Sequence, residues 1–281
     1  MTVSFLCEDK GTGCERIFLK NLRKYGNPPF RTAVVHGGPG AAGEMAPVAR
    51  EMGRRFGVME PLQTEVTLEG QVEELSRVLK QNGNLPLYLV GYSWGAWLCF
   101  ILAARYPMLV KKLILVGSGP FEDKYASNML EKRMEHMNKK DREEVKYLMN
   151  VLEGKEPGER NRALARLGLL IEKADAFDPL PKDQNEENNM IIRAGIFLNV
   201  WREAAEMRKS GRLLTLAGDI KCPVTAIHGN NDPHPAEGVW KPLQSVIRDF
   251  RFILLEHCGH KPWIERQARD KFFRVLDEEL S

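Results

Sequence analysis

Short runs of apolar residues, rich in Val, Ile and Leu, recur along this chain and stop at residues that favour turns. Runs that are apolar on both faces are typical of strands in a parallel sheet that is covered on both sides. The strands that this pattern predicts span residues 31–36, 87–90, 112–116, 223–228 and 250–255. Parallel strands need a crossover connection, so helices are expected between them.

Helical spacing of apolar residues does occur between these runs. The segment 69–81 places its apolar residues on one helical face, namely Val72, Leu75, Val78 and Leu79. Helices are also predicted at 94–106, which ends before Pro107, and at 264–280. Strands that alternate with helices predict an α/β fold, with a mostly parallel central sheet flanked by helices.

The stretch 121–218 has a different pattern, with many charges and helix formers and no good strand. The positions interpreted as its helical core are Met129, Met134, Met137, Leu148, Met149 and Leu152. We therefore expect this stretch to be a helical cap. It would be inserted into a core formed by residues 1–120 and 219–281.

Composition narrows the classes of function. The chain has 281 residues and a formal net charge of +3, with its Lys and Arg scattered, which predicts neither a nucleic-acid partner nor a membrane-binding face. Five cysteines without a CxxC pair indicate free thiols. The acidic N-terminus does not fit a signal peptide, so we expect a cytoplasmic protein. Oligomeric state has no readable signal.

The sequence 91–95 reads Gly-Tyr-Ser-Trp-Gly and matches the pattern G-x-S-x-G. It follows a predicted strand and opens a predicted helix, the context in which this pattern forms a sharp turn around a serine nucleophile. Side chains at either flank would collide with the neighbouring strand and helix, which explains Gly91 and Gly95. We predict Ser93 as the nucleophile.

A serine hydroxyl needs a base to take its proton, and the base needs an acid to orient it. His260 follows the last predicted strand and a glycine, and is favoured as the base over His257, which is still at the strand end. Asp232 lies after the strand 223–228 and is favoured as the acid, with Asp123 as the alternative. Ser, then Asp, then His is the chain order of this type of site.

The sequence 36–40, His-Gly-Gly-Pro-Gly, follows another strand and would let bare backbone approach a substrate. We expect the N–H groups of Gly38 and Trp94 to stabilise the oxyanion that forms in acyl transfer. Their neighbours Gly37 and Tyr92 are predicted to bind a small-molecule substrate. The chemistry needs neither a metal nor an organic cofactor.

Together these motifs resemble the α/β-hydrolase superfamily, and HGGPG with G-x-S-W-G is similar to its proline iminopeptidase branch. The resemblance covers both ends of the chain. It implies a triad of Ser93, Asp232 and His260 that cleaves an ester or an amide. The chain departs from that branch at 60–65, which reads EPLQTE instead of a glycine-rich D-Q-R-G-x-G-x-S stretch.

Iminopeptidases also hold the free amine of their substrate with acidic cap residues. The candidates for that role here are Glu203 and Glu206, although no motif aligns them. An aminopeptidase that removes N-terminal proline therefore stays an alternative to an esterase or amidase. A further alternative, from a different class, is a ligand-binding protein that has kept the fold without the catalysis.

Overall fold

A seven-stranded sheet forms the centre of the molecule, in a computed structural model that describes residues 21–154, 156–181 and 191–281. The strands, in their order across the sheet, are β1 (Leu22–Tyr25), β4 (Gly57–Pro61), β2 (Phe30–Val35), β5 (Leu87–Tyr92), β6 (Val110–Val116), β8 (Val224–Gly229) and β9 (Phe250–Leu255). Strand β1 pairs antiparallel with β4, and every other neighbouring pair in this sheet is parallel. The mostly parallel sheet expected from the sequence is confirmed.

All five predicted strands are present, and the structure adds β1 and β4 at one edge. Strand β4 was missed because it ends in Glu60 and Pro61, which the sequence analysis had placed in an altered loop. The side chain of Glu60 is nonetheless buried, and it accepts a hydrogen bond of 2.8 Å from the hydroxyl of Tyr25 on β1. A partner more than thirty residues away therefore makes this polar strand end stable inside the fold.

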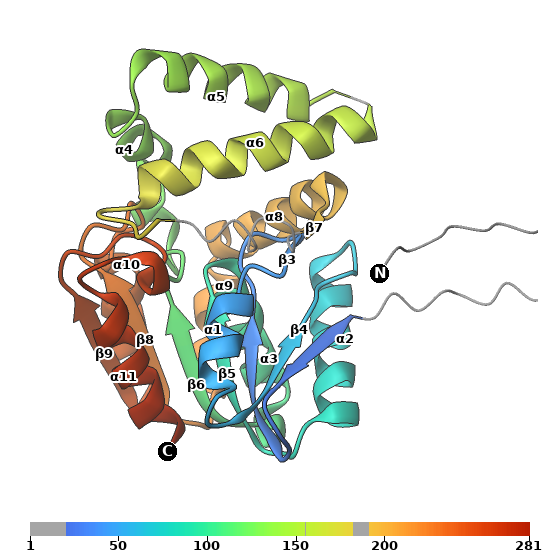
Figure 1. Cartoon of the computed structure of the whole chain (residues 1–281). Helices are drawn as coiled ribbons and strands as arrows, with labels where there is room; N and C mark the ends of the chain where they lie inside the picture. The colour runs from blue at the N-terminus through green and yellow to red at the C-terminus, as the bar shows by residue number, and fades with distance from the viewer. Residues whose placement is uncertain (1–20, 155, 182–190) are drawn as a thin grey trace, which may run out of the picture.

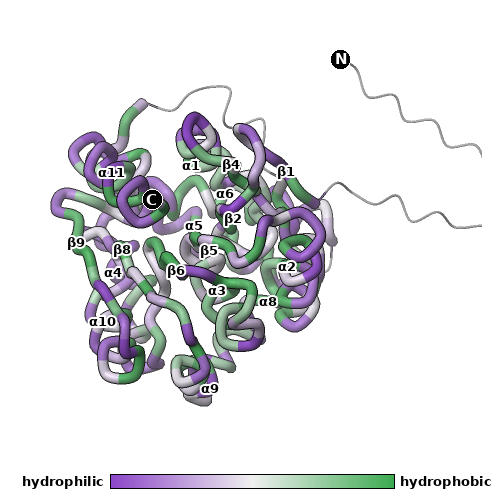
Figure 2. The backbone as a smooth tube through the Cα atoms, turned by 90° about the horizontal axis from the view of Figure 1, so that it is seen from below, coloured by the Kyte–Doolittle hydropathy of each residue, from purple (hydrophilic) through white to green (hydrophobic). Residues whose placement is uncertain are grey.

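Helices cover both faces of the sheet (Figure 1). One face packs against α2 (Leu68–Asn82), α3 (Trp94–Arg105) and α10 (Glu237–Gln244), and the other against α1 (Ala46–Met52) and α11 (Arg269–Leu280). Figure 2 shows green, apolar stretches at the strands in the interior and purple, polar stretches on the outer turns of the helices. The helices predicted at 69–81 and 94–106 are confirmed.

The last helix begins later than expected, at Arg269 instead of 264. A short 3-10 turn, Pro262–Ile264, precedes it. Glu265, just after this turn, has an extended backbone with φ of −82° and ψ of 121°, which interrupts the helix. Its side chain is fully buried and accepts hydrogen bonds from the backbone of Phe177 and Gly259.

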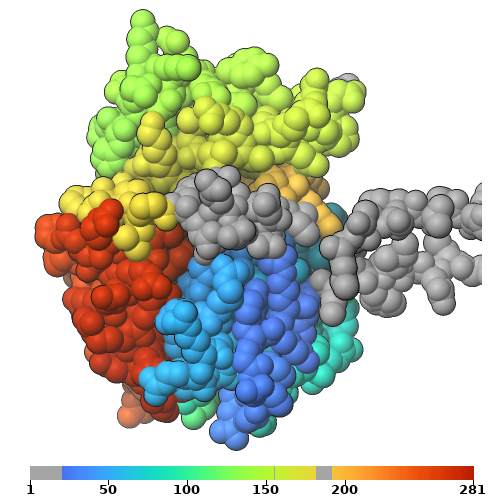
Figure 3. Space-filling view, viewed as in Figure 1, coloured from blue at the N-terminus to red at the C-terminus, as the bar shows by residue number. Residues whose placement is uncertain are grey.

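The segment between β6 and β8 is helical, with α4 (Met129–Glu135), α5 (Lys139–Leu152), α6 (Pro157–Asp175), α8 (Ala194–Lys209) and α9 (Arg212–Thr215). Helices α4, α5 and α6 have their own apolar cluster, and Figure 3 shows α5 and α6 as a lobe above the core. Helix α8 contributes to this cluster and also, with α9, to the cluster under α2 and α3. The division into a core and a cap at 121–218 stays a prediction.

Two details of this segment differ from the sequence analysis. A two-residue strand, β7 (Ile191–Ile192), pairs antiparallel with β3 (Ala41–Ala42), which follows the HGGPG sequence. Met149 is 41% exposed, so its interpretation as a core residue is wrong. The buried face of α5 is formed by Val145, Leu148 and Leu152 instead.

The search for membrane-spanning helices, made over the residues that the structure describes, found none with the length and apolar character to cross a bilayer. In the same residues Cys99, Cys222 and Cys258 are free thiols. Cys7 and Cys14 lie outside the described residues.

Candidate active site

Ser93 lies in the tight turn between β5 and α3, and its φ of 52° and ψ of −115° are unusual for a residue with a side chain. Such a backbone costs about 1–3 kcal/mol. The turn requires both flanking glycines. A Cβ on Gly95 would lie 2.5 Å from the carbonyl oxygen of His36, and one on Gly91 would lie 2.7 Å from the Cα of Ala96. The collisions expected from the sequence are confirmed.

Three side chains predicted from distant parts of the sequence meet at the carboxyl ends of β5, β8 and β9. The Nε2 atom of His260 lies 3.1 Å from the Oγ of Ser93, and its Nδ1 atom lies 2.7 Å from the Oδ2 of Asp232. An ionised carboxylate only accepts hydrogen bonds, so Nδ1 carries the proton and Nε2 is free to accept from the serine hydroxyl. The structure therefore joins the predicted nucleophile, base and acid in one chain of hydrogen bonds.

The two rival residues lie elsewhere. His257 is exposed and its ring contacts Phe177, with 5.4 Å between the ring centroids. Asp123 is exposed and forms an ion pair of 3.3 Å with Arg208. Of the two candidates for the base, His260 lies beside Ser93, and of the two candidates for the acid, Asp232 is bonded to His260.

A second histidine contacts the carboxylate of Asp232. Its Oδ1 atom accepts hydrogen bonds from both the backbone N–H and the imidazole Nδ1 of His234, each at 2.9 Å. Burial alone raises the pKa of Asp232, but the favourable interactions of its carboxylate with the imidazoles of His260, His234 and His228 outweigh it and hold that pKa well below its usual range. Burial lowers the pKa of His234 to about 4, so its ring is neutral at pH 7.

The ligand-type atoms of Asp232, His234 and His260 lie within 4.8 Å of one another, which raises the question of a metal site. Both imidazole Nδ1 atoms face the carboxylate and are hydrogen-bonded to it. A metal ion would have to displace both of these hydrogen bonds. The arrangement therefore fits a buried hydrogen-bond network better than a metal centre.

The loop 36–40 lies beside the serine turn. A Cβ on Gly37 would lie 2.8 Å from the ring of Tyr92, the residue before Ser93, and Gly38 has a φ of +23° that favours glycine. This places the loop that carries Gly38 next to Trp94, the residue after Ser93. The donation of their N–H groups to an oxyanion stays a prediction.

Gln63, which the sequence analysis did not single out, joins the two halves of this region. Its amide nitrogen donates to the carbonyl of His36, and its Oε1 accepts from the indole of Trp94, at 2.9 and 3.0 Å. The backbone N–H of Gln63 donates to Nε2 of His36, whose pKa is lowered by burial. Gln63, two residues after the end of β4, thus links the HGGPG loop to the residue that follows Ser93.

Tyr92 is almost fully buried, and its ring packs against His260 and Trp263 at centroid distances of 4.9 and 4.7 Å. Burial raises the pKa of its phenol well above the usual value, so the hydroxyl stays protonated. Its ring therefore packs against the predicted base. A contact of Tyr92 or Gly37 with a substrate stays a prediction.

The inserted helices hold the loop of His260 directly. The backbone N–H of His260 donates to the carbonyl of Asp175, at the end of α6, and Arg133 of α4 makes two hydrogen bonds of 2.7 Å to the carboxylate of Asp175. Gly259 is required here, because a Cβ would lie 2.6 Å from the Oε1 of Glu265. The position of the base therefore depends on the insertion as well as on β9.

A buried lysine next to the base ties the same helix to the HGGPG side. Lys261 forms ion pairs with Glu44, at 2.9 Å, and with Glu172 of α6. Burial lowers the pKa of Lys261, but the two carboxylates outweigh this and raise it above its usual value. The acidic pair beside the triad is therefore already neutralised in part by a cation of the chain itself.

Glu203 and Glu206, the candidates for binding an amine, do not join the triad. The carboxylate of Glu203 accepts from the backbone N–H of Leu68 at the start of α2, at 2.7 Å. Both glutamates line a surface hollow of about 550 Å³ together with Arg105 and Arg202. None of Ser93, Asp232 and His260 lines that hollow, and a role of these glutamates in holding a substrate amine stays a prediction.

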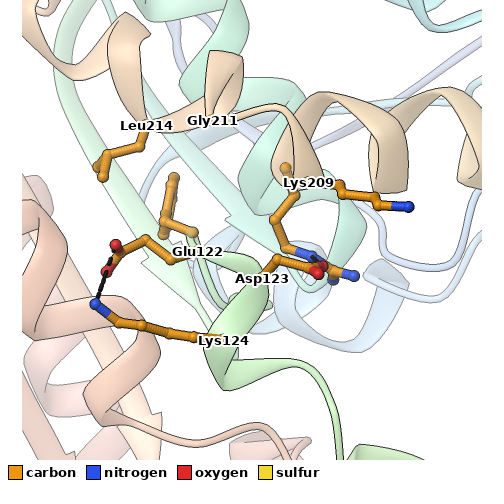
Figure 4. A pocket seen from close by; sticks show the side chains of 8 residues that line it. Glu122, Asp123, Lys124, Lys209, Gly211 and Leu214 are labelled. Carbon is orange, nitrogen blue, oxygen red and sulfur yellow. Dashed lines mark hydrogen bonds and ion pairs between the residues drawn. The ribbon is translucent and has the colours of Figure 1, made fainter.

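A second hollow, of about 240 Å³, lies between the segment after β6 and the start of α9. Figure 4 shows Lys124 and Glu122 reaching toward each other beside Leu214 and Gly211. Asp123 also lines it, and no triad residue does. This hollow is separate from the candidate active site.

Sequence reasoning missed three residues of the site, namely Gln63, His234 and Glu265. A signal existed for His234, because two of the six histidines fall within 228–234, around Asp232. Gln63 and Glu265 carry no local signal. Their roles come from partners that only the folded chain places beside them.

The motif resemblance agrees with a family comparison. A family model described as "alpha/beta hydrolase fold" matches residues 34–267, and the chain belongs to this family. A search of curated proteins gave no match.

Solved structures with the same architecture include VinJ, with 17% identity, a TM-score of 0.65 and coverage of 92% of this chain and 93% of that one. They also include a proline iminopeptidase from Mycobacterium smegmatis, with 19% identity, a TM-score of 0.57 and coverage of 92% and 93%. A putative lipase from Acinetobacter baumannii AYE has 17% identity, a TM-score of 0.59 and coverage of 92% and 87%. At these identities the likeness shows a shared fold alone.

Proposed function

We propose that this protein is a serine hydrolase that cleaves an ester or amide bond of a small molecule through an acyl-enzyme on Ser93. The observation that carries the proposal is the continuous hydrogen-bond chain from Ser93 through His260 to Asp232. The strained serine turn and the nearby HGGPG loop support it, because they supply a half-buried hydroxyl on a tight bend and backbone donors that no side chain covers.

In the first half-reaction the Oγ of Ser93 attacks the substrate carbonyl carbon while Nε2 of His260 takes the hydroxyl proton. The carbonyl oxygen becomes an oxyanion, which the N–H groups of Gly38 and Trp94 stabilise. Collapse of this intermediate breaks the bond to the leaving group, which receives the proton from His260. Asp232 stabilises the imidazolium that exists between these two proton transfers.

In the second half-reaction water attacks the acyl-enzyme, and His260 first takes a proton from the water and then returns one to Oγ. The products are an acid and the free serine. No redox step or external group is needed. The segment 121–218 contacts both sides of the site, through Asp175 and through the pairing of β7 with β3, so we propose that it acts as the cap that selects substrates.

The aminopeptidase alternative has less support. The acidic pair nearest the triad, Glu44 and Glu172, is bridged by Lys261, and Glu203 is used at the start of α2. A substrate with a free amine would have to compete with Lys261 for the same carboxylates. We therefore favour substrates without a positive charge next to the scissile bond.

A fluorophosphonate probe tests the proposal, because it phosphonylates only an activated serine. We expect the native protein to be labelled at Ser93, the Ser93→Ala variant to remain unlabelled, and the Ser245→Ala variant to be labelled like the native protein. Folded native protein that is not labelled and hydrolyses no ester or amide would favour the ligand-binding alternative.

A panel of substrates then distinguishes an esterase or amidase from an aminopeptidase. Short acyl nitrophenyl esters and acyl anilides are compared with aminoacyl naphthylamides, including prolyl naphthylamide. We expect turnover of the acyl compounds and little of the aminoacyl ones. Preferential cleavage of prolyl naphthylamide would instead establish the aminopeptidase.

A further inference from the structure

The acid of the triad has two histidine neighbours besides its base, and the proposed mechanism uses neither. His234 and His228 are both buried, at 5% and 1% exposure. Buried histidines around a carboxylate must be explained, because each needs a hydrogen-bond partner or loses free energy. Their contacts assign a role to one of them.

His234 makes two hydrogen bonds to a single atom. Its backbone N–H and its imidazole Nδ1 both lie 2.9 Å from the Oδ1 of Asp232, while the Nδ1 of His260 lies 2.7 Å from Oδ2. Since the carboxylate only accepts, Nδ1 of His234 carries a proton and donates it. The two oxygens of Asp232 are thus occupied on opposite sides by different histidines.

His228 holds the loop that carries His234. Its Nε2 atom lies 2.9 Å from the carbonyl oxygen of His234, so this nitrogen carries the proton and donates it. The same nitrogen lies 3.5 Å from the Oδ2 of Asp232. Within the residues that the structure describes, Nδ1 of His228 is buried without a hydrogen-bond partner.

We propose that His234 is a positioning residue of the triad, which fixes the carboxylate of Asp232 so that Oδ2 faces the base. The inference rests on the proposed function for its kinetic consequence, but the hydrogen-bond arrangement stands in the free protein. Because Oδ1 is held by two donors, rotation of the carboxylate would break both of these bonds. Oδ2 is therefore kept in line with Nδ1 of His260.

The ring of His234 also lies against that of His260, with 4.5 Å between their centroids. The charged and titratable groups that face His234 are Asp232, His260, His228 and Arg133. Because its pKa is lowered to about 4, His234 stays neutral when His260 becomes an imidazolium in the reaction. A neutral donor can orient the acid without repelling the charged base.

Two variants and one control test this role. His234→Leu removes the imidazole donor at similar size, and His234→Asn keeps an amide N–H at about the position of Nδ1. His136→Leu is the control, because His136 is exposed and its imidazole is bonded to the carbonyl of Ala174 and not to Asp232. The readouts are kcat and KM for a nitrophenyl ester, the pH dependence of kcat/KM, and the low-field proton resonance of Nδ1 of His260.

We expect His234→Leu to lower kcat about 10- to 100-fold with little change in KM, since a hydrogen bond to a charged group is lost. His234→Asn should recover most of this loss, and His136→Leu should match the native protein. Because the carboxylate of Asp232 is no longer held in line, it stabilises the imidazolium of His260 less, so the acid limb of the kcat/KM profile should move to lower pH in His234→Leu.

The Nδ1 proton resonance of His260 tests the positioning role of His234 without any substrate. The proton between His260 and Asp232 should shift and exchange faster in His234→Leu, and return toward its native position in His234→Asn. A folded His234→Leu with native kcat, acid limb and resonance overturns the role of His234. So does a folded His234→Asn that behaves like the leucine variant. If no substrate is turned over but the resonance responds as expected, the proposed function fails and the positioning role stands.

Discussion

A substitution of Glu265 tests how much its hydrogen bonds stabilise the loop that carries His260. Its buried carboxylate accepts three backbone N–H groups, from Gly259 and Phe177 at Oε1 and from Asp178 at Oε2, at 3.0, 2.9 and 2.8 Å. Two of these donors belong to the segment after α6, and one immediately precedes His260. The side chain therefore links the inserted helices to the base.

The substitution Glu265→Gln keeps the shape of this side chain but replaces one acceptor oxygen with an NH₂ group. If the amide oxygen faces Gly259 and Phe177, the NH₂ group faces the N–H of Asp178, which is left unpaired at a cost of about 1–3 kcal/mol. The two remaining bonds lose the charge that strengthens them, about 1 kcal/mol each. Relief from burying a charge offsets a part of this.

We therefore expect Glu265→Gln to lower the free energy of unfolding by about 2–4 kcal/mol, and Tm by about 5–15 °C. The looser loop should also lower kcat about 10-fold or more, because small displacements of a catalytic group slow the reaction strongly. Urea unfolding followed by tryptophan fluorescence, together with ester hydrolysis, measures both. Glu278→Gln, on the exposed side of α11, is the control and should change stability by less than about 0.5 kcal/mol. A Glu265→Gln variant as stable as this control would refute the reasoning.

Two further expectations concern backbone space and pH. Gly95→Ala should abolish hydrolysis and strongly destabilise the fold, because its Cβ would overlap the carbonyl oxygen of His36. The control Gly195→Ala, whose Cβ meets no atom within 4 Å, should stabilise α8 by up to about 1 kcal/mol. Thermal unfolding of the two variants measures both effects. The unfolded chain protonates His234 near its ordinary pKa of about 6.5 and the folded chain only near 4, so stability should fall as pH drops from 6.5 to 4, by up to about 3 kcal/mol from this residue. Urea unfolding at pH 7 and 4.5 should show a smaller loss in His234→Asn than in the native protein, and an equal loss would contradict the assignment.

The sequence alone determined the parts of this protein that depend on local pattern. Continuous apolar runs predicted five strands of the sheet, because a strand buried on both faces needs apolar residues at every position. The glycines around Ser93 predicted the serine turn, because only glycine fits between a strand and the helix that folds back on it. The strand ends before Asp232 and His260 placed both residues at one edge of the sheet, since parallel strands all end there.

Tertiary structure decided what depends on partners far apart in the chain. The edge strands β1 and β4 have weak local patterns and are stabilised by pairing with each other and by the contact of Tyr25 with Glu60. The hydrogen bond from the backbone N–H of His260 to the carbonyl of Asp175 joins residues 85 positions apart. His234 donates two hydrogen bonds to Asp232, and hydrophobic periodicity does not predict that this carboxylate is buried. Hydrophobic periodicity reports which face of an element is buried, but not which polar groups meet there, and in this protein those polar contacts position the triad.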